Sequence, residues 1–84
     1  LQLYASFVIQ PDNFQEIEEF IEIFNDINVP IKFVPVQYLD KKLNSLTYIN
    51  MCNYVMNIIK SLGDNQIAIT NELITVYETF KKLI

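Results

Sequence analysis

Residues 4–36 read YASFVIQPDNFQEIEEFIEIFNDINVPIKFVPV, and the pattern of apolar positions changes twice along them. Residues 3–10 and 31–36 are short runs of β-branched and aromatic residues, which favour β-strands. In residues 13–27 the apolar positions recur three and four apart, as they do on one face of a helix. Two strands joined by a helix predict a βαβ unit, whose strands are parallel and whose helix covers one face of the sheet.

Several residues in this stretch are typical of element boundaries. Asn13 is a preferred N-cap, and Glu16, three positions later, completes a pattern like a capping box. Val29-Pro30 should end the helix, because a proline pushes the residue before it toward extended geometry. Pro35 lacks a backbone N–H, which predicts that strand 31–36 lies at a sheet edge or ends there.

The first strand is apolar on both of its sides. Phe7 and Ile9 point to one face and Tyr4 and Val8 to the other, which predicts that both faces are at least partly covered. A lone βαβ unit leaves one face and at least one edge of its sheet open. The chain has 84 residues, of which 51% are hydrophobic, and so small a domain has little interior for them. We therefore expect part of a larger domain or an obligate oligomer.

The second half of the chain is predicted to be mainly helical. Residues 37–42 are interpreted as a loop, and residues 45–62 and 71–84 as helices with one apolar face each. Gly63 is suited to the position just after a helix end. Residues 66–70 are interpreted as a short extended segment, after which Thr70 or Asn71 caps the last helix. The predicted fold class is therefore α/β, a βαβ unit followed by two helices.

Composition excludes several classes of function. The net charge is −4, with six basic residues against ten acidic ones and no basic cluster, which argues against binding to nucleic acid. No apolar run is long enough for a membrane span, no secretory leader is recognisable, and one cysteine excludes an internal disulfide, so we expect a cytoplasmic protein that does not bind a membrane. Because Leu1 and Ile84 lie within apolar patterns, we also expect the chain to be a fragment of a larger protein.

Residues capable of catalysis are few. The chain has no histidine, and Cys52 lies on an apolar helix face, where a packed core cysteine is expected. A single glycine excludes a glycine-rich phosphate loop. In α/β sheets ligands bind beyond the carboxyl ends of the parallel strands, which places Gln10 and Asn13 at the predicted site. Asn13 is interpreted either as a helix cap or as a ligand contact.

Residues 7–21, FVIQPDNFQEIEEFI, followed by residues 29–36, VPIKFVPV, resemble the later part of a radical SAM barrel. In that family a hydrophobic strand ends in a polar turn, an Asn-x-x-Glu pattern like Asn13 to Glu16 opens a helix, and the next strand carries an aromatic residue. Residues 66–73, QIAITNEL, resemble the segment that enters a helix after the barrel. The resemblance implies the C-terminal part of a partial (β/α)6 TIM-like barrel.

The same resemblance implies cofactors that this chain could hold only in part. The family's CxxxCxxC motif, which binds a [4Fe-4S] cluster, is absent, so the cluster ligands would lie elsewhere in a parent enzyme. The chain would form barrel wall and part of the S-adenosylmethionine pocket without catalysing the reaction alone. By resemblance, Asn13, Gln10, Val34 and Val36 would contact S-adenosylmethionine.

A second hypothesis requires no missing residues. A small standalone α/β interaction module could bury its surplus apolar surface against a partner or in an oligomer. This hypothesis explains the lack of a catalytic constellation equally well.

Overall fold

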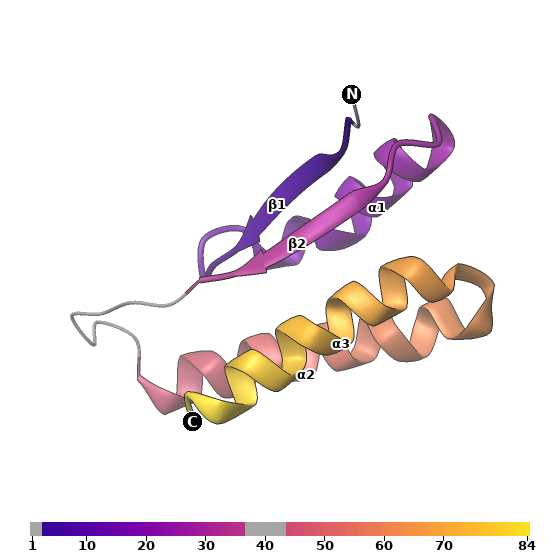
Figure 1. The fold of residues 1–84 in the computed structure, drawn as a ribbon. Helices are drawn as coiled ribbons and strands as arrows, with labels where there is room; N and C mark the ends of the chain where they lie inside the picture. The colour runs from indigo at the N-terminus through magenta and orange to yellow at the C-terminus, as the bar shows by residue number, and fades with distance from the viewer. Residues whose placement is uncertain (1–2, 37–43) are drawn as a thin grey trace.

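The computed structural model describes residues 3–36 and 44–84 and has two layers, a sheet and a layer of helices (Figure 1). Its elements, in chain order, are β1 (Ala5–Ile9), the short 3-10 helix η1 (Phe14–Glu16), α1 (Ile17–Asp26), β2 (Ile31–Pro35), α2 (Ser45–Leu62), the 3-10 helix η2 (Gly63–Gln66) and α3 (Ile67–Lys82). The strands β1 and β2 are parallel neighbours joined through α1, so the predicted βαβ unit is confirmed. The predicted loop at 37–42 lies outside the described residues.

The register of the sheet determines which backbone groups face outward. Ala5 pairs with Ile31, its N–H donates to the Pro30 carbonyl at 2.8 Å, and the Val36 N–H donates to the Ile9 carbonyl at 3.1 Å. Since the N–H and C=O of one strand residue point to the same side and successive residues alternate, the odd-numbered residues of β1 bond to β2. The even-numbered residues of β1 direct these groups to its outer edge.

The same alternation explains Pro35. On β2 the even-numbered residues bond to β1, so Ile31, Phe33 and Pro35 direct their backbone groups to the opposite outer edge. The missing N–H of Pro35 therefore removes no bond between the two strands. Within the described residues β2 is an edge strand, as predicted.

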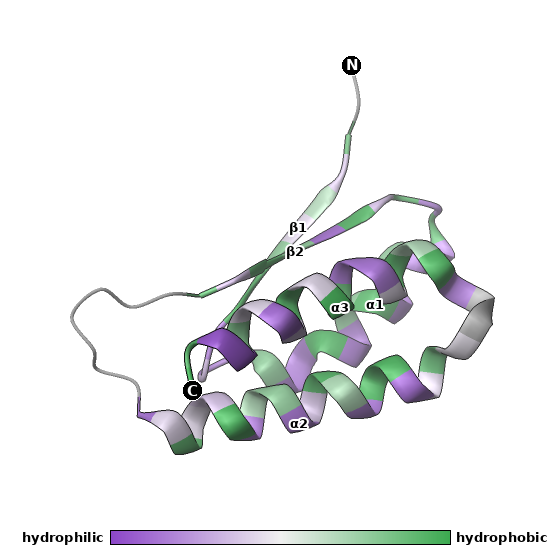
Figure 2. Cartoon of the chain, turned by 60° about the horizontal axis from the view of Figure 1, so that its bottom comes forward, coloured by the Kyte–Doolittle hydropathy of each residue, from purple (hydrophilic) through white to green (hydrophobic). Residues whose placement is uncertain are grey.

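All the helices cover one face of the sheet (Figure 2). Ile9, Ile31 and Phe33 are buried on that face, while Val8 and Val34 on the opposite face are 43% and 40% exposed. The prediction that both faces of the first strand are covered is therefore wrong for the described part of the chain. A two-stranded sheet with every helix on one side has no second layer for the other face.

The core lies between the sheet and the antiparallel pair α2 and α3. The side chains with no exposed surface come from four elements, which shows that the layers share one interior. They are Ile9, Ile17, Met51, Val55, Leu73, Val76 and Phe80. None of the helices in residues 3–36 and 44–84 combines the length and apolar character required to cross a membrane.

The observed α2 has the predicted bounds, and Gly63 follows it with a positive φ of 57°, as expected of a residue just after a helix end. The extended segment predicted at 66–70 is wrong, because Gln66 ends η2 and α3 begins at Ile67. Ile69 is buried in line with Leu73, so packing of this helix face overrides the strand preference of β-branched residues.

The predicted caps of the last helix are also wrong. Thr70 and Asn71 lie inside α3, and the Thr70 hydroxyl donates to the Gly63 carbonyl at 3.4 Å instead of capping a helix start. Because the helix begins four residues earlier than predicted, the first turn of α3 follows η2 almost directly. The α2–η2–α3 segment is consequently one helical hairpin.

Candidate functional site

The residues predicted as a site separate onto the two sides of β1. Gln10 and Asn13 lie together at the end of β1, where the Gln10 N–H donates to Asn13 Oδ1 at 2.8 Å. Val36 lies on the other side, where its N–H bonds to the Ile9 carbonyl, and Val34 pairs with Val8 and exposes its side chain on the uncovered face. The structure thus brings together Gln10 and Asn13 only.

The Asn13 side chain does not cap the following helix. Its Oδ1 accepts from Gln10, and its Nδ2 donates to the Val8 carbonyl at 2.7 Å, while no cap bond reaches the first helical turn. The capping-box prediction is therefore wrong. The cause is the turn after β1, in which the N–H groups of Asn13 and Phe14 both bond to the Gln10 carbonyl and the chain folds back beside the strand.

This amide occupies the place of a neighbouring strand. The Val8 carbonyl and the Gln10 N–H both belong to the outer edge of β1, where the next parallel strand would meet them with one N–H and one C=O. A side-chain amide supplies the same donor and acceptor as a peptide group. Asn13 therefore closes the outer edge of β1 at its carboxyl end.

Within residues 3–36 and 44–84, the rest of that edge is unpaired. Among the described residues, no hydrogen bond reaches the outward N–H and C=O of Ser6 or the N–H of Val8. Unpaired strand groups of this kind are a template for pairing with another strand. We call the outward N–H and C=O of Ser6 and the N–H of Val8 the β1 edge.

A shallow apolar groove of about 180 Å³ lies beside the β1 edge on the helix side. It is lined by Phe7, Phe20 and Ile23, with Glu16 and Glu19 also at its walls, and we call it the Phe7 groove. The Phe7 and Phe20 rings meet edge to face, with centroids 4.8 Å apart, and Ile23 is 51% exposed. Since no residue of β2, α2 or α3 lines it, the groove opens on the side of β1 away from β2.

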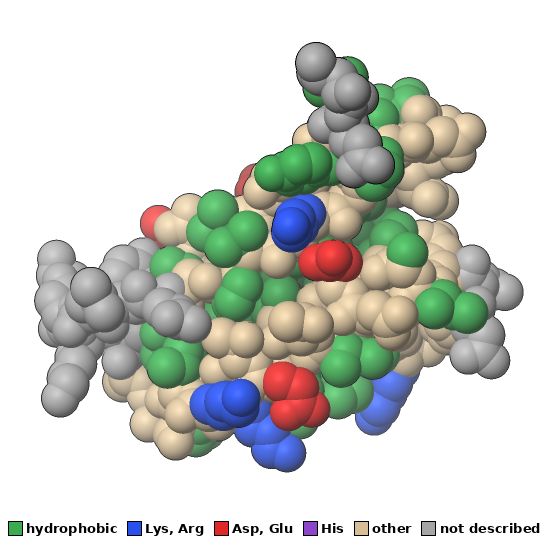
Figure 3. All heavy atoms as spheres, viewed as in Figure 1, with side chains coloured by type: hydrophobic (Ala, Val, Ile, Leu, Met, Phe, Trp, Pro, Cys, Tyr) green, Lys and Arg blue, Asp and Glu red, His purple; other side chains and the backbone are tan. Residues whose placement is uncertain are grey.

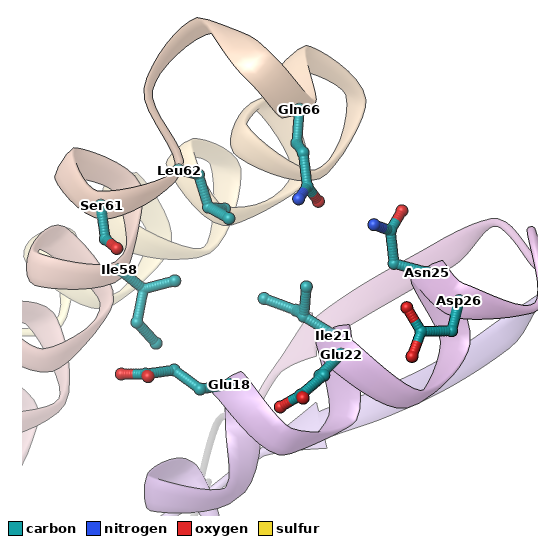
Figure 4. A pocket seen from close by; sticks show the side chains of 9 residues that line it. All are labelled: Glu18, Ile21, Glu22, Asn25, Asp26, Ile58, Ser61, Leu62 and Gln66. Atoms are coloured by element: carbon teal, nitrogen blue, oxygen red, sulfur yellow. The ribbon is translucent and has the colours of Figure 1, made fainter.

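Larger hollows lie elsewhere, one of them a groove of about 440 Å³ between residues 28–31 and the start of α3. A pocket of about 250 Å³ between α1 and the α2–α3 turn is flanked by Glu18, Glu22 and Asp26, and the buried Gln66 Oε1 has no hydrogen-bond partner among the described residues (Figure 4). These carboxylates are exposed, and the described residues gather no set of three possible metal ligands. On the face seen in Figure 3, hydrophobic side chains form small separate groups, and basic and acidic side chains lie next to one another between them.

Cys52 is a core residue, as predicted. It is 5% exposed, and burial raises the pKa of its thiol, an effect that the positive charge of Lys81 opposes in part. We therefore expect the thiol of the folded protein to react roughly tenfold or more slowly with Ellman's reagent than in urea. Equal rates in both conditions would show that the cysteine is accessible.

The raised pKa of Cys52 also predicts how stability changes with pH. In the folded state the thiol stays protonated to higher pH than in the unfolded chain. The contribution of the thiol to the free energy of unfolding is fully present below its pKa in the unfolded chain, about 8.5. It is lost as the pH rises through the pKa of the thiol in the folded protein. Cys52→Ser should remove this alkaline dependence in denaturation curves measured from neutral to alkaline pH.

The chain matches no protein-family model, and no curated protein or solved structure is significantly similar to it. Its function must therefore be inferred from its own residues. The Phe7 groove was not predicted from the sequence. The available signal was Ile23, an apolar residue outside the buried stripe of its helix and next to Glu22.

Proposed function

We propose that this chain is a protein-interaction module that accepts an extended segment of a partner protein at the β1 edge. The observation that carries the proposal is the juxtaposition of unpaired backbone groups at Ser6 and Val8 with the Phe7 groove. In strand addition of this kind, backbone hydrogen bonds supply affinity and side-chain pockets supply specificity.

The two outer edges of the sheet are not equivalent. On β2, Pro35 removes a donor from the outer edge, which is a common protection against unwanted pairing. On β1 the open groups lie next to an apolar groove, and no groove residue comes from β2. These features support β1, rather than β2, as the receiving strand.

The experiment uses peptides selected from a random displayed library on the wild-type chain. Ser6→Pro removes the outward N–H without removing a bond between β1 and β2, whereas Ser6→Ala retains it. We expect selected peptides to bind wild type and Ser6→Ala alike and to lose most of their affinity for Ser6→Pro. They should also slow hydrogen exchange of the Ser6 and Val8 amides. A failed selection, or equal binding to all three proteins, would refute the proposal.

A second candidate function is the wall of a radical SAM barrel. It is favoured by one observation, that every helix lies on the same face of a parallel sheet, as in barrels whose helices form an outer ring. In this proposal Gln10, Asn13, Val34 and Val36 would lie near S-adenosylmethionine. The described residues do not fit the cofactors well, since the Asn13 amide is bonded to β1 and the sole cysteine is buried.

The coding sequence upstream of Leu1 separates these candidates. A CxxxCxxC motif there would support the barrel. An upstream reading frame without it would leave the interaction module.

A further inference from the structure

We infer that the β1 edge binds a short extended segment in which an apolar residue is followed or preceded, two positions away, by lysine or arginine. This inference rests on the proposed function and specifies the chemistry of the partner. It follows from three features of the site. Asn13 closes one end of the β1 edge, Glu16 and Glu19 make one wall of the Phe7 groove acidic, and a second copy of the chain does not complement this site.

The closed end limits the length of the segment. Because the Asn13 amide already bonds to the Val8 carbonyl and the Gln10 N–H, an incoming strand can pair only with the part of β1 before them. Together with Tyr4, which precedes β1, that part extends to the Val8 N–H and accommodates a strand of about five residues. Asn13 thus limits the length of strand that can pair with β1.

The acidic wall determines the side chains. Alternate residues of a strand point to the same face, so residues i and i+2 of the incoming segment both lie over the helix side of the sheet. There one of them can fill the Phe7 groove, and the other reaches Glu16 or Glu19, both exposed. Exposed carboxylates without a basic neighbour in the groove lining favour a cationic side chain.

A second copy of the chain is a poor occupant of this site. A two-fold axis would place β1 beside β1, and the face of that strand toward the helices carries Ala5, Phe7 and Ile9, with no basic residue. The symmetry would also bring Glu16 and Glu19 of both copies together, in a chain whose net charge is already −4. The charge pattern therefore points to a different protein as the partner.

The test uses two capped synthetic peptides of about seven residues, each a threonine background with one central leucine. The first carries lysine two positions from the leucine, and the second carries glutamate there. We expect wild type to bind the lysine peptide about two- to fivefold more tightly than the glutamate peptide, the range for an exposed ion pair. Glu19→Lys should reverse this preference, and Glu78→Lys, at an exposed position on α3, should not change it.

Length is tested with an elongated lysine peptide of about ten residues. Wild type should bind the long and short peptides with equal affinity. The Asn13→Ala variant should bind the long peptide more tightly than the short one. Equal affinity of the lysine and glutamate peptides, tighter binding of the long peptide by wild type, or a dimer in sedimentation that is lost in Ser6→Pro would overturn the inference. Absence of any peptide protection at the Ser6 and Val8 amides would instead refute the proposed function itself.

Discussion

Replacement of Phe80 by alanine should lower the free energy of unfolding by about 3 to 5 kcal/mol, the range for removal of a buried aromatic side chain. Phe80 has no exposed surface, and its ring lies 5.7 Å from that of Tyr48, which joins α3 to α2. A domain of this size has a total stability of about 4 to 13 kcal/mol. The substitution could therefore unfold much of the population at room temperature.

The measurement is urea denaturation followed by circular dichroism. Ile74→Ala is the matched control, because Ile74 lies on the same helix and is 41% exposed. Its cost should stay near or below about 1 kcal/mol. Phe80→Leu keeps the variant folded and should fall between the two. Similar midpoints for Phe80→Leu and Ile74→Ala would contradict the assignment of the faces of α3.

The second large effect is expected at Asn13. A helix cap would tolerate aspartate, but in the observed geometry aspartate loses the bond that Nδ2 donates to the Val8 carbonyl. It also places a carboxylate beside that carbonyl oxygen. Asn13→Asp should therefore cost about 0.5 to 1.5 kcal/mol at neutral pH, more than Asn13→Ala.

The pH dependence of this variant has a definite sign. Only the protonated carboxyl can donate to Val8, so its pKa in the folded state should lie above the unfolded value of about 3.9. The stability of the variant should then be closest to that of wild type below that pH. It should decrease relative to wild type as the pH rises through the pKa of the carboxyl in the folded state.

Thermal unfolding of both proteins at several pH values measures this difference. Asn53→Asp, at an exposed position on α2, is the control and should show no such trend. An Asn13→Asp variant as stable as wild type at neutral pH would restore the cap interpretation.

Much of the fold could be predicted because its signals are local. The βαβ unit follows from periodicity between residues 3 and 36, and the bounds of α2 follow from its apolar stripe and Gly63. Residues 66–70 were misjudged because their β-branched composition favours strand, while burial of Ile69 depends on a surface that only the folded chain provides.

The candidate site could not be predicted in the same way. Asn13 has the sequence context of a cap, and its actual partners depend on how the turn at Pro11 and Asp12 directs the chain back along β1. The Phe7 groove joins a strand residue to residues of α1, and its position relative to an open edge depends on strand order. Neither property is encoded in the spacing of residues along the chain.

The positions of Asn13 and Pro35 bear on the stoichiometry of any assembly. They lie at opposite outer edges of the sheet but at the same end of it, so both edges are shortened where the strands finish. Unlimited stacking of copies needs two edges on every copy that can pair along their whole length. A sheet shortened in this way favours closed complexes with one partner per chain, and it disfavours fibres.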